Sequence, residues 1–355
     1  MRGPRLLQPL WIHTVAFMMI LLLIFLFLFQ ASKPNGMARK AWLLHVQPRV
    51  FEVDWNWLQS LVLIVACPTA TNAEATELVR VLRRTSMADK TVIVTILDET
   101  WASPGSVLDL FLESFRVGQG TQRFLNHLVV VALDNQAFQY CNAIHPHCFQ
   151  LPLFESKIAA VEGLFTTPDH LMLNRRRNDI LLQVIELGYN LVFTEADSMW
   201  FRSPFSDFHP IYQITVPCDF TPQSGRNKPD KGIFHMKSDD IAVDFLKYWQ
   251  FERVLYPNTL DLSLCEMTTR LDIVDMVGVR IKYPDPGNFG GFCEDSKDMS
   301  EVYTMHAACC DNVKHKVHDM RLLLDDWINF TAKLSANASL GPSSFSWRAP
   351  KKCMR

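Results

Sequence analysis

Hydrophobic residues along this chain gather in short continuous runs that alternate with stretches of helical spacing. The runs at 91–97, 127–133 and 190–194 are rich in Val, Ile and Leu and predict buried strands. Between them, the stretches from about 105 to 117 and from about 171 to 187 predict helices. Such strands separated by helices are typical of a largely parallel sheet covered on both faces, so we predict an α/β fold.

Shorter segments of the same two kinds fill the second half of the chain. Short apolar stretches predict further strands at 211–216, 233–237, 279–283 and 302–306. Helical spacing predicts helices at about 239–251 and 311–330. No linker and no internal repeat separates these segments from the earlier strands, so they either complete the same sheet or form a second lobe.

The N-terminus has a different pattern, because apolar residues run without interruption from 15 to 29. Extended back to residue 10, the run reaches about twenty residues, and at ~1.5 Å per residue it matches the ~30 Å hydrocarbon core of a bilayer. We therefore predict a cytosolic tail at 1–9 and a transmembrane signal anchor at 10–29. A cleaved signal peptide is the competing interpretation, but it would place the bulky Phe29 at −3, where cleavage requires a small residue.

Charge is distributed as unevenly as hydrophobicity. The 355 residues carry 35 Lys and Arg against 37 Asp and Glu, and this formal net charge of −2 argues against a nucleic-acid partner. The first 40 residues hold five basic side chains and no acid, which leaves 30 basic and 37 acidic residues on the other 315.

A chain with 48% hydrophobic residues can fold around a large core. We predict a stem at 30–60, a globular domain at 61–335 and a C-terminal tail at 336–355.

Nine cysteines without a CxxC pair follow the apolar leader, and this favours disulfides in an oxidising lumen over a zinc ribbon. We expect Cys141 and Cys148 to tie one loop. Cys309 and Cys310 are expected to pair with other cysteines rather than to bind zinc with the nearby histidines. The odd count leaves at least one thiol, and Cys265 is the candidate because it stands at an apolar position of a predicted helix.

Two N-glycosylation sequons begin at Asn329 and Asn337. They can be modified only if the body of the protein lies in the lumen. Together with the leader and the cysteines, they favour a single-pass type II membrane protein with a lumenal domain.

Acidic residues follow each of the three strong predicted strands. Asp98 comes after the first, Asp134 after the second, and Glu195 and Asp197 after the third. Ligands of open parallel sheets bind at the carboxyl ends of strands, so these residues are the first candidates for a site. Neither GxGxxG nor a P-loop occurs, which disfavours nicotinamide enzymes and P-loop kinases.

Glu195 and Asp197 are spaced i, i+2 on a predicted turn. Two such carboxylates can converge on a hard divalent cation that also bridges a diphosphate, as the transfer of a sugar from a sugar nucleotide requires. The alternative is a solvated acidic turn that ends a strand.

Residues 188–205, which read GYNLVFTEADSMWFRSPF, resemble the DxD segment of the plant nucleotide-diphospho-sugar transferases of glycosyltransferase family 77. Further matching stretches are VTIL at 94–97, WA at 101–102, LDNQA at 133–137, HPHC at 145–148, FGGFCE at 289–294 and MHAACC at 305–310. The resemblance spans about 92–327. It implies a GT-A fold, a single-pass Golgi anchor, a UDP-sugar donor and manganese or magnesium. It also implies transfer with retention of configuration onto a plant cell-wall glycan or glycoprotein.

The resemblance also implies roles for individual residues. Asp197 would ligate the metal, with Glu195 in place of the usual first Asp and His306 as a further ligand. The residues expected around the donor are Thr95 and Leu97 at the nucleoside, Asp134 at uracil or ribose, and Gly232, Gly290 and Gly291. On the helix before the acidic turn, helical spacing points Arg176 toward the sheet and turns Arg175 and Arg177 aside. Arg176 is either a diphosphate contact or part of a solvated helix end.

The sequence departs from the family in two segments. Where the family has His-Asp-Gln-Asp after Tyr-Pro, residues 256–263 read YPNTLDLS, and only Asp261 is retained as a candidate catalytic residue. Residues 227–234 read NKPDKGIF, so Gly232 is kept and a charged Lys231 precedes it. These changes leave two hypotheses, an active glycosyltransferase or an inactive relative that binds glycan or partners an active enzyme.

Overall fold

The computed structural model describes residues 72–151, 169–218, 231–255, 263–293, 298–310, 312–336 and 346–353. The predicted cytosolic tail, anchor and stem lie outside these residues, as do Asp261 and Asn337. Within the described ranges, no helix combines the length and the apolar character needed to cross a membrane.

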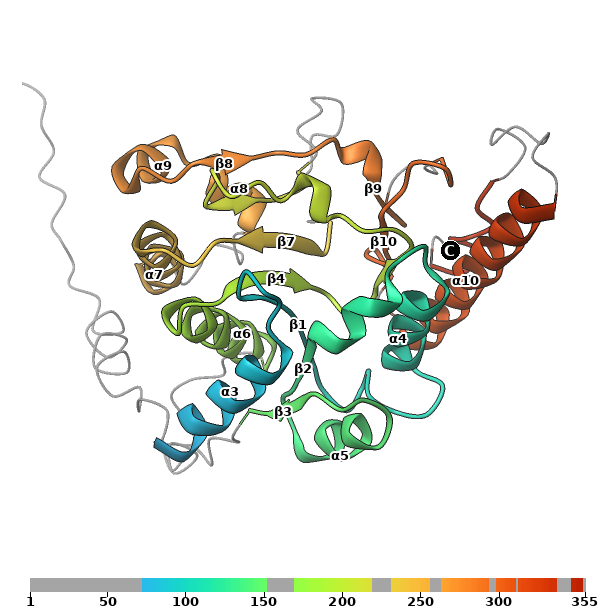
Figure 1. Ribbon diagram of the computed structural model, residues 1–355, viewed down its shortest axis with the longest axis horizontal. Helices are drawn as coiled ribbons and strands as arrows, with labels where there is room; N and C mark the ends of the chain where they lie inside the picture. The colour runs from blue at the N-terminus through green and yellow to red at the C-terminus, as the bar shows by residue number, and fades with distance from the viewer. Residues whose placement is uncertain are drawn as a thin grey trace, which may run out of the picture. The chain divides into compact units, whose positions relative to one another are not determined.

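A mixed sheet forms the centre of the domain (Figure 1). In the described part of the chain its strand order is β3-β2-β1-β4-β7-β6-β8. The strands that run parallel side by side are β3 (Cys148–Gln150), β2 (Leu128–Ala132), β1 (Thr91–Leu97) and β4 (Asn190–Thr194). Beyond β4, the strand β7 (Ile233–Met236) is antiparallel to β4 and to β6 (Ile214–Thr215), and β8 (Ile281–Lys282) is parallel to β6. The predicted strands at 211–216, 233–237 and 279–283 therefore complete the same sheet.

A second, smaller sheet has the order β5-β10-β9. It contains β5 (Ser198–Trp200), β10 (Thr304–His306) and β9 (Phe289–Gly291). The strand β10 is antiparallel to β5 and parallel to β9, which places His306 opposite both Ser198 and Gly291. The strand predicted at 302–306 thus joins this sheet beside β5, which directly follows the acidic turn after β4.

Alternation along β1 explains why the domain has two hydrophobic cores. Ile93 and Leu97 enter one cluster, whereas Val92, Val94 and Ile96 enter the other, because successive side chains of a strand point to opposite faces. The helices α4 (Val107–Val117), α5 (Asn135–Ile144) and α10 (Val313–Ala336) contribute to the first cluster, and α4 lies beside α10. The second cluster takes residues from α3 (Asn72–Thr85), α6 (Asp169–Glu186), α7 (Asp240–Leu255), α8 (Leu264–Thr268) and α9 (Leu271–Val277).

Short 3₁₀ helices lie at Gln122–His127, Phe205–Asp207 and Pro286–Asn288. The predicted helices at 105–117, 171–187, 239–251 and 311–330 correspond to α4, α6, α7 and α10. The predicted α/β fold, with a mixed and mostly parallel sheet flanked by helices, is confirmed.

Disulfides link eight of the cysteines, in the pairs Cys141–Cys148, Cys218–Cys265, Cys293–Cys309 and Cys310–Cys353. The predicted Cys141–Cys148 bond is confirmed, and so is the pairing of Cys309 and Cys310 with other cysteines. The prediction of a free thiol at Cys265 is wrong. The start of α8 brings Cys265 next to the chain that follows β6, where the Cα atoms of Cys218 and Cys265 are 5.7 Å apart. The ninth cysteine, Cys67, lies outside the described residues.

Candidate functional site

The turn after β4 is held against the start of β7 by hydrogen bonds to one backbone carbonyl. The Glu195 N–H donates to the Gly232 carbonyl at 2.8 Å, and the Ser198 hydroxyl donates to the same carbonyl at 3.2 Å. Gly232 has φ +66°, a backbone conformation that favours glycine. A Cβ atom at this position would lie 2.3 Å from the Ser198 Oγ and 2.8 Å from two ring carbons of His306. Gly232 therefore allows β7, the acidic turn and His306 to pack closely together.

Asp197 is the buried carboxylate of this turn, with 2% of its surface exposed. Its Oδ1 lies 3.1 Å from Nε2 of His306, and its backbone carbonyl accepts the Ala307 N–H at 3.0 Å. Burial alone would raise the pKa of Asp197. The charges and hydrogen bonds of His306 and Lys316 together outweigh burial and hold that pKa well below its usual range, so Asp197 is a carboxylate.

Lys316 is the second partner of the Asp197 carboxylate, and sequence reasoning missed it. Its Nζ lies 2.5 Å from the Asp197 Oδ2 and 4.6 Å from the ring centre of Trp101, and the residue is 7% exposed. Lys316 is on α10 at helical spacing from the fully buried Met320 and Leu323. The sequence did contain a signal for this ion pair. A lysine within the apolar stripe of a helix is expected to be buried, and a buried lysine needs an anionic partner.

Glu195 has a different partner. Its Oε1 lies 2.7 Å from Nη1 of Arg177, whose guanidinium also lies over the Phe193 ring, 5.5 Å from the centroid. Phe193 belongs to the second hydrophobic cluster, to which α6 also contributes. Glu195 comes two residues later and therefore lies on the same face of the sheet. The expectation that Arg177 turns aside is therefore wrong. The Arg176 side chain lies outside what the structure describes.

The two acidic residues of the turn are thus paired with different cations. Among the described residues, no group of three or more His, Cys, Asp and Glu side chains is arranged to hold a metal ion. Asp197 and His306 nevertheless suit a divalent ion. Two octahedral ligands at about 2.1 Å from a small divalent ion lie about 3 Å apart, close to their 3.1 Å separation. Glu195, as it is paired here, does not add a third ligand.

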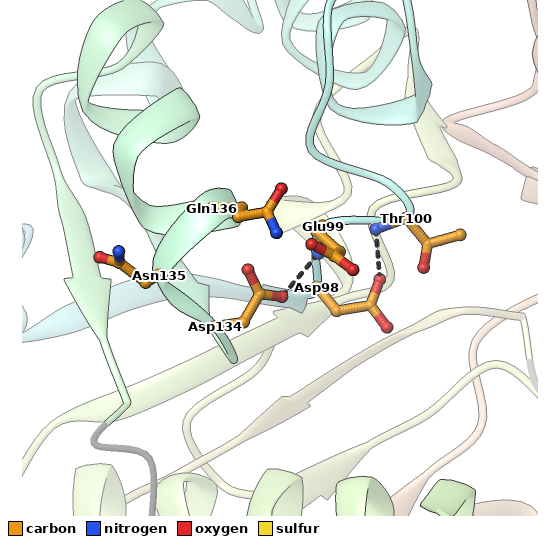
Figure 2. A pocket seen from close by; sticks show the side chains of 6 residues that line it. All are labelled: Asp98, Glu99, Thr100, Asp134, Asn135 and Gln136. Carbon is orange, nitrogen blue, oxygen red and sulfur yellow. Dashed lines mark hydrogen bonds between the residues drawn. The ribbon is translucent and has the colours of Figure 1, made fainter.

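A cavity of about 440 Å³ opens at the carboxyl ends of β1 and β2 (Figure 2). It is lined by Asp98, Glu99, Thr100, Asp134, Asn135 and Gln136. Asp134 builds one wall, because its Oδ2 accepts the Glu99 N–H at 2.7 Å and its Oδ1 accepts the Ala137 N–H at 2.8 Å, which caps α5. Two of the candidates at strand ends, Asp98 and Asp134, therefore line one cavity, and Trp101, which contacts Lys316, directly follows the lining segment.

The other candidate residues have mixed placements. Thr95 and Leu97 are buried inside the sheet and are not among the residues that line the cavity. Gly290 and Gly291 belong to β9, where a Cβ on Gly291 would lie 3.1 Å from the His306 carbonyl oxygen. These glycines therefore contact the strand that carries His306. Asn329 is exposed on α10.

Residues 123–320 match the family model described as nucleotide-diphospho-sugar transferase. The chain is 33% identical to the Arabidopsis thaliana protein At4g15970 over 280 residues, which cover 78% of this chain and 73% of that protein. It is 29% identical over 100 residues to the Arabidopsis thaliana UDP-D-xylose:L-fucose alpha-1,3-D-xylosyltransferase 1, covering 27% of this chain and 26% of that protein.

Among solved structures, a glycosyltransferase involved in the glycosylation of the major capsid of PBCV-1 matches 65% of this chain and 99% of its own chain. The sequence identity is 13% and the TM-score is 0.38.

Proposed function

This chain belongs to the nucleotide-diphospho-sugar transferase family, and from that premise we propose that it transfers a sugar from a UDP-sugar to a glycan or glycoprotein acceptor. UDP is proposed as the carrier because the name of a xylosyltransferase relative specifies a UDP-sugar donor. The observation that carries the proposal is the buried Asp197 carboxylate between His306 and Lys316. It lies on the turn after β4, in the segment that resembles the DxD segment of the family.

The proposal assigns two parts of the donor. The cavity at the ends of β1 and β2 is proposed to take the nucleoside, and polar side chains such as Asp98 and Gln136 on its walls support this (Figure 2). Lys316, which contacts Trp101 beside this cavity, offers a positive charge to the diphosphate. Negative charge grows on the diphosphate as its bond to the sugar breaks, so a cation beside the diphosphate stabilises the transition state more than the bound donor.

A divalent ion, manganese or magnesium, fits the same proposal. Asp197 and His306 are the residues that would hold it, and when bound it would neutralise charge on the departing diphosphate. Glu195, through Arg177, fixes the turn that carries Asp197. The finer features of the proposal are retention of anomeric configuration and a plant cell-wall acceptor.

We further propose that the enzyme is a type II Golgi membrane protein with a lumenal catalytic domain. The apolar segment at 10–29 supports the anchor. The disulfides at Cys141–Cys148, Cys218–Cys265, Cys293–Cys309 and Cys310–Cys353 support an oxidising compartment.

The test uses the full chain, purified in detergent and supplied with Mn²⁺ and a panel of UDP-sugars. We expect release of UDP with at least one donor, and we expect Asp197→Asn to abolish it. Asp275→Asn, at an exposed position of α9, is the matched control and should retain activity. Absence of turnover with every donor, together with absence of UDP binding, would refute the enzyme proposal and favour a non-catalytic glycan-binding or partner protein.

A further inference from the structure

Asp197 already has a partner at each of its carboxylate oxygens. His306 Nε2 lies 3.1 Å from Oδ1, and Lys316 Nζ lies 2.5 Å from Oδ2. The side chains of Lys316 and Asp197 are only 9% and 3% exposed, so water screens this ion pair weakly. A divalent ion that approached Asp197 and His306 would therefore meet the ammonium of Lys316 at close range, without solvent between them.

Lys316 also contacts the aromatic ring of Trp101. Its Nζ lies 4.6 Å from the Trp101 ring centre, and Trp101 directly follows the segment 98–100 that lines the strand-end cavity. The lysine ammonium is carried on a flexible four-carbon stem, so it can turn from one partner to another. An anionic diphosphate beside the cavity would attract the ammonium away from Asp197, and the released carboxylate oxygen would then be available to a metal.

We propose that Lys316 blocks metal binding at Asp197 in the nucleotide-free protein through their ion pair, so that a divalent ion binds strongly only together with a nucleoside diphosphate. This inference rests on the proposed function and couples its two ligands. When both are bound, the ammonium of Lys316 contacts the diphosphate and the carboxylate of Asp197 contacts the metal. Bound UDP and bound metal therefore strengthen each other, and the coupling is reciprocal.

Metal binding itself, rather than activity, tests the proposal. Free Mn²⁺ is measured by electron paramagnetic resonance while Mn²⁺ is titrated into the full chain in detergent, with and without UDP. For the native chain we expect affinity for Mn²⁺ to be at least about ten-fold higher with UDP, as removal of a like charge at close range requires. Equal affinity with and without UDP would overturn the proposal without the use of any variant.

Lys316→Met removes the charge and retains an unbranched apolar stem against Trp101. We expect this variant to bind Mn²⁺ without UDP at least about ten-fold more tightly than the native chain, because the competing cation is gone. Lys314→Met, at an exposed position two residues earlier on α10, is the matched control and should leave Mn²⁺ affinity unchanged. A folded Lys316→Met protein with native Mn²⁺ affinity would overturn the inference.

The same titrations separate this inference from the proposed function. UDP binding is followed by calorimetry in parallel. If UDP binds but leaves Mn²⁺ affinity unchanged, the proposal that Lys316 blocks metal binding at Asp197 is refuted and the donor proposal stands. If UDP does not bind under any condition, both are refuted.

Discussion

Replacement of Gly232 by alanine is the sharpest single test of the site geometry. Gly232 has φ +66°, and its carbonyl receives hydrogen bonds from the Glu195 N–H and the Ser198 hydroxyl. An added Cβ would lie 2.3 Å from the Ser198 Oγ and 2.8 Å from two ring carbons of His306. The substitution therefore adds one methyl group at the point where the acidic turn, β7 and β10 meet.

The cost of Gly232→Ala has separate contributions. The left-handed backbone costs an alanine about 1–2 kcal/mol. The Ser198 hydroxyl can rotate away, but the loss of its hydrogen bond costs about 1 kcal/mol. The His306 ring must move by about 0.6 Å to reach an ordinary contact, and such overpacking typically costs about 1–3 kcal/mol. We expect the free energy of unfolding to fall by roughly 3–6 kcal/mol.

Gly278→Ala separates the backbone cost from the steric cost. Gly278 ends α9 with φ +74°, and a Cβ there would have no atom within 4 Å. We expect this control to lose only about 1–2 kcal/mol, as the left-handed conformation alone requires. Urea unfolding of both variants, followed by tryptophan fluorescence, measures the difference.

Affinity for Mn²⁺ in the presence of UDP should fall in Gly232→Ala, because movement of His306 disturbs its contact with Asp197, and should be native in Gly278→Ala. Equal destabilisation of the two variants would refute the close packing of Gly232 on His306.

Three further predictions concern stability and topology. Asp319→Ala should lower the free energy of unfolding by about 3 kcal/mol or more, because the buried carboxylate accepts three backbone N–H groups of the C-terminal segment. Asp325→Ala, at an exposed position on the same helix, should change it by less than about 0.5 kcal/mol in the same urea titration. Burial lowers the pKa of His235 to about 4, so the unfolded chain takes up the proton first and stability should fall by up to about 3 kcal/mol from about pH 6.5 to 4. His235→Phe should flatten the dependence of the urea midpoint on pH, and an unchanged slope would contradict this. Asn329 is exposed, so Asn329→Gln should remove one glycan from the chain expressed in plant cells, seen as a gel shift that endoglycosidase also produces. An unglycosylated native chain would contradict the lumenal orientation.

The long strands were predictable because burial on both faces leaves a continuous apolar run. The predicted strands at 91–97 and 190–194 have the bounds of β1 and β4, and the run at 127–133 contains β2. The strands of the small sheet were harder to predict. β5, β9 and β10 have three residues each, and β9 contains two glycines, so neither strand periodicity nor propensity marks its position.

The part of the site that lies at strand ends or within the family motifs could be predicted from the sequence. Asp197 and His306 were named from the sequence, and the structure brings them together at 3.1 Å. Lys316 was missed because local pattern assigns it only to a helix, and its partner is 119 residues away in the chain. Arg177 was misplaced because helical spacing gives a direction around the helix but not how far a long side chain reaches.

The segment of chain between His306 and Lys316 makes the geometry of the site depend on disulfide formation. Cys309 and Cys310 lie between these two residues in the sequence, and each forms a separate disulfide, with Cys293 and Cys353 respectively. The first ties this segment to the chain just after β9, and the second ties it to the C-terminal segment that Asp319 holds against α10. Both partners of Asp197 are therefore positioned by a segment that is cross-linked at its middle. Because these bonds persist only under oxidising conditions, assembly of the site is expected to depend on the same environment that the predicted lumenal topology supplies.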